Sequence, residues 1–237
     1  MLRTAAPLIG ALGINRAMVV RLPVREVILE FPTGVRAQFV DQFQGGIEEF
    51  TLHLEHASAD WQAFRAIIGN DLDKQLMSGF IYLAINSLAV SMHLFLSGFS
   101  IAAGNCQRQV IESIAMALLG SKPHLGYLRR FHEGRFTSNK ALETVLKKHK
   151  LLNVNKDALV SLRTLRDHYH NFSHPTEMTA AMQMSMGVPY ELYFGAAYDE
   201  TKILQYRKEL TVRINLAKLL INLIEGAKAN VSDRIDT

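Results

Sequence analysis

The sequence predicts an all-α protein: an antiparallel helical bundle of four or five longer helices, preceded by an irregular N-terminal arm. Of the 237 residues, 49% are hydrophobic and 20% are charged, a composition typical of a folded globular domain. From residue 40 onward, apolar side chains recur at the three- and four-residue spacing of a helix. We therefore expect an arm over residues 1–37, extended or strand-like, and a single helical-bundle domain over residues 38–237.

The N-terminal arm has a different pattern from the rest of the chain. Residues 19–31 (VVRLPVREVILEF) are rich in β-branched side chains that partly alternate with polar ones, which indicates a strand or an extended arm. Pro23 favours a sheet edge or a bend. Pro7 and Gly10 interrupt the first apolar run, so the run does not resemble a secretion signal. Together with the single cysteine, Cys106, this favours the cytoplasm.

The longest apolar stretch predicts two buried helices. Residues 75–107 contain no Lys, Arg, Asp or Glu, and their length would suit a membrane span. However, Asn86, His93 and several serines are spread around the helix, and Gly98 offers a natural helix end. We therefore expect helices over residues 72–97 and 100–119 joined by a tight turn, and we favour this arrangement over a membrane span.

The second of these helices carries a polar stripe. Asn105, Arg108 and Glu112 fall on one face at 100° per residue, and apolar side chains cover the opposite face. Charges on such a helix are costly to bury unless they are paired, and Arg108 and Glu112 have the i,i+4 spacing of an ion pair. The stripe is either a structural ion pair or the lining of an internal polar site.

A basic segment follows. Residues 122–150 contain eight Lys or Arg and two Glu, a net charge of +6 against +4 for the whole chain. Tyr127, Phe131 and Phe136 are interleaved with these cations. Basic groups near aromatic rings suit a phosphate backbone with stackable bases, whereas the alternative is a pair of solvated helices.

The C-terminal part predicts a short strand and one more long helix. Residues 188–194 (VPYELYF) alternate in the manner of a strand, and Asp199 suits the N-cap of the helix. Apolar residues then recur every seven positions for about three heptads, which predicts a bundle seam. These are Ile203, Leu210, Ala217 and Ile224.

The segment RTLRDHYHNFSHPT, residues 163–176, concentrates the reactive side chains. On a helical wheel, Tyr169 belongs to the apolar stripe, whereas two arginines and two histidines cluster on one flank of it. Pro175 ends the helix near His174. The flanking residues are Arg163, Arg166, His170 and His174.

Three interpretations of this flank compete. In the first, His170 and His174 chelate a metal ion with help from Asp167, but the neighbouring arginines would repel a cation, so we expect no metal and no cofactor. In the second, the flank is the hydrogen-bonded polar edge of a bundle helix. In the third, arginine binds phosphate and histidine transfers a proton near neutral pH, as metal-free cleavage of RNA requires.

A helical bundle whose late helix carries an arginine, four to six residues and then a histidine resembles the HEPN-domain proteins. Arg163 and His170 enclose six residues and fit this pattern. Arg163 and His168 enclose four but lie far apart on the wheel, and Arg166 and His174 enclose seven, one too many. The resemblance extends loosely over residues 60–226.

The resemblance implies a dimer in which the Arg/His helices face each other. Many proteins of this family are metal-independent ribonucleases of toxin–antitoxin or phage-defence systems, and others only bind. On this basis we expect an RNA-binding protein or ribonuclease, a homodimer with an antitoxin or other protein as partner. Arg163 and Arg166 would hold phosphate, and His170 or His174 would act as acid or base. The supporting residues would be Arg108, Glu112, Tyr169 and Asn171. The alternative function is a non-catalytic helical module that binds another protein.

Overall fold

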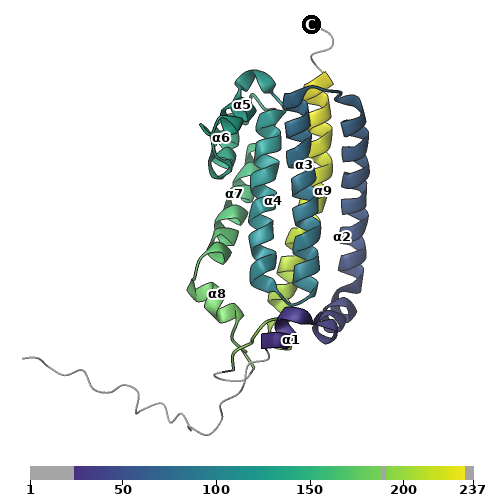
Figure 1. Cartoon of the computed structure of the whole chain (residues 1–237), viewed down its shortest axis with the longest axis vertical. Helices are drawn as coiled ribbons and strands as arrows, with labels where there is room; N and C mark the ends of the chain where they lie inside the picture. The colour runs from purple at the N-terminus through teal and green to yellow at the C-terminus, as the bar shows by residue number, and fades with distance from the viewer. Residues whose placement is uncertain (1–23, 188–190, 233–237) are drawn as a thin grey trace, which may run out of the picture. The chain divides into compact units, whose positions relative to one another are not determined.

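The computed structural model of the chain describes residues 24–187 and 191–232, and every element named in them is helical, which confirms the predicted all-α class. The chain divides into two compact units, Met1–Phe31 and Pro32–Thr237. The second unit contains the bundle, drawn in Figure 1. Its longer helices are α2 (Thr33–Ile67), α3 (Leu72–Leu96), α4 (Ser100–Gly120), α7 (Lys156–His170) and α9 (Ile203–Ser232). Its shorter helices are α5 (Tyr127–His132), α6 (Ala141–Lys147) and α8 (Glu177–Met182).

The described part of the first unit is a short helix, α1 (Val24–Leu29). The extended or strand-like conformation predicted for the arm, residues 1–37, is wrong for the six residues of α1 and for residues 33–37, which belong to α2. Residues 1–23 lie outside the described part. Pro23, which we predict at a sheet edge or a bend, lies outside the described residues.

The predicted break between two apolar helices is confirmed. α3 ends at Leu96 and α4 begins at Ser100, within one residue of the predicted bounds, 72–97 and 100–119. Gly98 makes the turn with φ of +78°, a left-handed conformation that favours glycine. A Cβ at this position would also lie only 2.7 Å from the backbone nitrogen of Ala197, so the close approach of that loop needs glycine as well.

Consecutive long helices run antiparallel, but α2 and α9 run parallel. Ser91 of α3 donates a hydrogen bond to the carbonyl of Ala103 in α4 across a tight connection (2.9 Å). By contrast, Lys218 of α9 pairs with Glu49 of α2 (2.7 Å), and ten residues further along α9 Lys228 pairs with Asp60 (3.7 Å). Figure 1 shows α9 passing behind α3 and rising in the same direction as α2.

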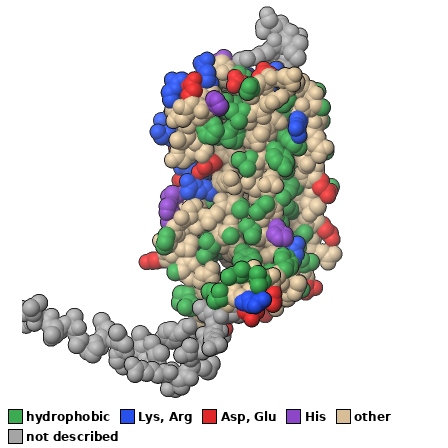
Figure 2. Space-filling model, viewed as in Figure 1, with side chains coloured by type: hydrophobic (Ala, Val, Ile, Leu, Met, Phe, Trp, Pro, Cys, Tyr) green, Lys and Arg blue, Asp and Glu red, His purple; other side chains and the backbone are tan. Residues whose placement is uncertain are grey.

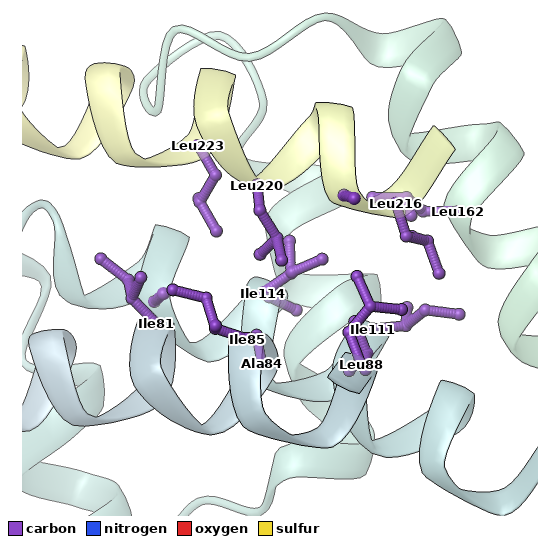
Figure 3. Close-up of a cluster of buried hydrophobic side chains, with 14 of the residues drawn as sticks. Ile81, Ala84, Ile85, Leu88, Ile111, Ile114, Leu162, Leu216, Leu220 and Leu223 are labelled. Atoms are coloured by element: carbon purple, nitrogen blue, oxygen red, sulfur yellow. The ribbon is translucent and has the colours of Figure 1, made fainter. Parts of the chain in front are cut away.

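The core lies between α2, α3, α4, α7 and α9. Figure 3 shows Ile81, Ile85 and Leu88 of α3 facing a cluster of leucine and isoleucine side chains. The other labelled members are Ala84, Ile111, Ile114, Leu162, Leu216, Leu220 and Leu223. The seven-residue seam of α9 contributes as predicted, because Leu210, Ala217 and Ile224 are buried and Ile203 is partly buried.

Among the described residues, one helix, α3, is long and apolar enough to cross a membrane by length and composition alone. Half of its most apolar window is buried against the rest of the protein, as in the core helix of a soluble bundle. The length and hydropathy of α3 are therefore weak grounds for a membrane span.

The strand predicted over residues 188–194 is not formed in the described part of that segment. Residues 188–190 lie outside the described ranges, and the remainder makes one isolated antiparallel bridge, between Met184 and Leu192. A single bridge lacks the repeated backbone pairing that holds a strand in place. After this connection, Asp199 accepts a hydrogen bond from the backbone N–H of Thr201 (3.0 Å) and starts the turn that leads into α9, close to the predicted start.

Candidate functional site

Helix α7 carries the candidate site, and its ends are set by local sequence. Asn155 caps the N-terminus, because its side-chain oxygen accepts hydrogen bonds from the backbone N–H groups of Asp157 (2.8 Å) and Ala158 (3.1 Å). At the other end, residues 171–173 form a single 3₁₀ turn. His174 is then extended, with φ of −134° and ψ of 153°, as expected for a residue before proline.

The centre of the site is a contact between His170 on α7 and Arg108 on α4. The guanidinium Nη1 of Arg108 lies 3.1 Å from Nδ1 of the His170 ring. Arginine has only donors, so Nδ1 is the acceptor in this contact and the ring proton lies on Nε2. The sequence predicted Arg108 as a supporting residue, and the structure brings it together with His170 although the two are 62 positions apart in the chain.

A chain of polar contacts surrounds this pair. Arg108 donates through Nε to Glu112 (2.9 Å), the i,i+4 ion pair expected from the sequence, and through Nη1 to the hydroxyl of Ser173 (3.3 Å). Ser173 in turn donates to the side-chain oxygen of Asn105 (2.9 Å). The second oxygen of Glu112 accepts a hydrogen bond from Ser138 (3.0 Å). The polar stripe of α4 therefore faces the end of α7 at the surface and does not line an internal cavity.

The two arginines of α7 have carboxylate partners from a short neighbouring helix. Arg166 donates to Glu143 of α6 (3.3 Å) and to Asp167 (2.7 Å). Arg163 lies 4.0 Å from the other oxygen of Glu143. A phosphate that binds these arginines must therefore compete with Glu143, which lowers the affinity that the positive charge would otherwise provide.

The two histidines proposed as acid or base are neighbours. The rings of His170 and His174 meet edge to face, with their centroids 4.7 Å apart, and both residues are exposed. Figure 2 shows His, Lys and Arg side chains along the edge of the molecule where α5, α6 and α7 lie. Within residues 24–187 and 191–232 there is no group of three or more side chains that could hold a metal ion.

The remaining predicted residues, Tyr169 and Asn171, do not join this surface cluster. Tyr169 is fully buried, and its hydroxyl donates a hydrogen bond to Glu209 of α9 (2.8 Å). Burial, followed by the nearby charge of Glu209, raises the pKa of the Tyr169 hydroxyl. Asn171 is exposed, and its backbone carbonyl accepts a hydrogen bond from Thr176 (3.2 Å). Tyr169 therefore fixes α7 to α9, and Asn171 belongs to the turn that follows α7.

No protein-family model, curated protein or solved structure matches this chain. The chemistry of the site must therefore be inferred from its geometry.

Sequence reasoning missed a buried ionic group next to the site. Arg213 of α9 is 1% exposed and donates to both the side chain (2.9 Å) and the backbone carbonyl (2.8 Å) of Glu209. Burial alone would raise the pKa of Glu209. The contact with His168 (3.7 Å), the hydrogen bonds from Arg213 and Tyr169, and the charge of Arg213 outweigh burial and lower this pKa to about 2. The i,i+4 spacing of Glu209 and Arg213 on an otherwise apolar helix face is the signal that could have revealed the pair.

Proposed function

We propose that the surface formed by α4 and the end of α7 binds RNA and cleaves it without a metal ion, as many HEPN-domain proteins do. The observation that carries the proposal is the contact between Arg108 and His170. It places a permanent cation and a titratable base within 3.1 Å of each other on an exposed surface. Such a pair suits the binding of a phosphate and the removal of a proton from a neighbouring hydroxyl.

The contact also suggests how substrate would activate the base. While Arg108 donates to Nδ1 of His170, the lone pair of that nitrogen is occupied. A phosphate that draws the Arg108 guanidinium away would free Nδ1 to accept the proton of the ribose 2′-hydroxyl. The 2′-oxygen would then attack phosphorus, and the bond to the 5′-oxygen would break. A proton from His174 or water would pass to that leaving oxygen, giving a 2′,3′-cyclic phosphate and a 5′-hydroxyl.

A second copy of the chain would complete this site. Arg163 and His170 are two helical turns apart, about 10 Å of helix rise. Within one chain, the two side chains would therefore reach different parts of a substrate. Helix α7 lies at the edge of the bundle in Figure 1, where the α7 of another copy could face it. We therefore propose a homodimer in which Arg163 and Arg166 of one copy support His170 of its partner. A cytoplasmic role as a toxin or phage-defence nuclease, restrained by a protein antitoxin, would follow.

The test is cleavage of RNA by the purified protein in excess chelator. His170→Ala, His174→Ala and Arg108→Ala would be compared with His56→Ala and Arg207→Ala, which alter exposed residues on α2 and α9, away from the site. We expect wild-type protein and both controls to leave 2′,3′-cyclic phosphate ends. The loss of His170 should abolish cleavage, and the loss of Arg108 should reduce it by about 100-fold or more.

Two further readouts separate binding from catalysis. Because phosphate contacts release counterions, binding of RNA should weaken steeply as salt is raised, with a smaller salt dependence in Arg108→Ala. If the wild-type protein neither binds nor cleaves RNA while all variants remain folded, the ribonuclease proposal is wrong. The alternative, a helical module that binds another protein, would then take its place.

A further inference from the structure

On the side of α7 away from His170, a cavity of about 340 Å³ opens between α4, α7 and α9. Ile114 and Leu118 of α4, Leu159 and Leu162 of α7, and Leu223 of α9 line it. Three of these side chains, Ile114, Leu162 and Leu223, are labelled in Figure 3, so the cavity is an opening in the main core cluster.

None of the described residues that line the cavity carries a charge. Apart from its aliphatic residues and Gly226, the polar groups of the wall are four asparagine amides, Asn153, Asn155, Asn222 and Asn230. Asn222 is exposed, and Asn230 is held in place by a hydrogen bond from its amide nitrogen to Ser121 (3.0 Å). Neutral amides can both donate and accept hydrogen bonds, but they offer no counter-charge to an ionised ligand. This lining disfavours phosphates, carboxylates and ammonium ions, because a charge in an apolar cavity needs a partner.

The size of the cavity limits its occupant further. A volume of about 340 Å³ lies at the lower end of the range of small-molecule sites. An α-helix with its side chains is about 10–12 Å wide and would not fit in this space. The cavity is therefore suited to a small molecule and not to a segment of a partner protein.

The cavity is unfilled and open to solvent because two of the residues that line it have small side chains. Ala158 of α7 and Gly226 of α9 line the cavity from opposite sides, and both are exposed. A Cβ added at Gly226 would meet no atom within 4 Å. A leucine at either position would cover or fill the space that a ligand needs, and it would not disturb the packed core below.

We propose that this cavity is a binding site for a small, uncharged and largely apolar molecule with a single hydrogen-bonding group, such as a medium-chain alcohol or an aromatic alcohol. The aliphatic chain or ring would lie against Leu118, Leu159 and Leu162. The polar group would point to the asparagine amides at the mouth. This site is separate from the Arg108–His170 surface and does not depend on the RNA chemistry proposed above.

The test uses the full chain and a neutral fluorescent probe, N-phenyl-1-naphthylamine, displaced by linear 1-alkanols from four to ten carbons. We expect saturable binding of one probe per chain, with the affinity of the alkanols rising roughly fourfold per methylene until the cavity is full. The carboxylate of the same chain length should bind at least tenfold more weakly than the alkanol. Gly226→Leu and Ala158→Leu should each reduce alkanol affinity at least tenfold.

The matched control is Gly45→Leu. Gly45 is also an exposed helical glycine with no atom within 4 Å of an added Cβ, but it lies on α2 and does not line the cavity. It should leave binding unchanged, and circular dichroism would verify that all three variants remain helical. Absence of saturable binding to the wild type would overturn the proposal. The proposal would also be overturned if both cavity variants bound alkanols as tightly as the wild type does. The same holds if carboxylates bound as tightly as alkanols of the same chain length.

Discussion

Glu209 should give the protein a large and specific dependence of stability on pH. Its pKa falls from an ordinary value of 4.5 to about 2 in the folded protein. Because each pKa unit is worth about 1.4 kcal/mol, ionised Glu209 contributes about 3 kcal/mol to the free energy of unfolding at pH 7. A carboxyl whose folded pKa is lowered stabilises the protein above its unfolded pKa, and this contribution is lost as pH falls from about 4.5 towards 2.

The perturbation is Glu209→Gln, which removes the titrating group and leaves Arg213 buried without a counter-charge. At pH 7 we expect the free energy of unfolding to fall by about 3–5 kcal/mol, the usual cost of removing one partner from a buried ion pair. At pH 3 the wild type should have lost about 2 kcal/mol of the contribution of Glu209, so the difference between wild type and variant should narrow by that amount. Urea unfolding at pH 7, 5 and 3, followed by circular dichroism, measures both quantities.

The control is Glu225→Gln, which alters an exposed glutamate on the same helix and should change the stability by less than about 0.5 kcal/mol at each pH. A second variant, Glu209→Gln combined with Arg213→Met, replaces the buried charges by a polar and an apolar group and should recover part of the loss. A constant difference between wild type and Glu209→Gln from pH 7 to pH 3 would refute the reasoning, because it would mean that Glu209 has a similar pKa in both states.

Two further substitutions test the packing of α7. Gly104→Ala would place a Cβ into the ring of Phe172, so we expect the free energy of unfolding, measured in urea, to fall by about 1–3 kcal/mol. Gly45→Ala, whose Cβ would lie in open space, should be neutral or stabilising. No loss in Gly104→Ala would show that the ring can move aside. Tyr169→Phe removes the hydroxyl that donates to Glu209 and should lower the free energy of unfolding by about 1.5–3 kcal/mol, while the circular dichroism spectrum stays that of the wild type. An unchanged melting temperature would show that water replaces the hydroxyl.

Much of the fold could be predicted because it follows from local patterns in the sequence. The turn at Gly98 follows from a glycine placed between two apolar helical runs, and the seam of α9 follows from a seven-residue repeat. Residues 19–31 were interpreted as extended because β-branched side chains dominate the segment, yet six of them form α1. Propensity is a weak guide for such a short segment, because tertiary context can override it.

The candidate site could be predicted only in part, because its contacts join distant segments. The wheel placed His170 and the arginines of α7 on one flank, but it could not show that Glu143 lies opposite them or that Arg108 reaches His170. The partner of the Tyr169 hydroxyl could not be predicted for the same reason. An aromatic residue on the apolar stripe can still direct its hydroxyl to a partner on another helix, and that partner, Glu209, is 40 positions away.

The parallel pairing of α2 and α9 has a consequence for how the chain folds during synthesis. The ring of Phe39, near the start of α2, packs 4.9 Å from the ring of Tyr206, and Gly46 lies close against Leu210. These contacts close a loop of more than 160 residues, so α2 lacks this covering until α9 has left the ribosome. Until then the apolar side of the first long helix is available to chaperones or to another nascent chain. The pairing of α2 with α9, more than the formation of any single helix, would set the moment at which the bundle closes.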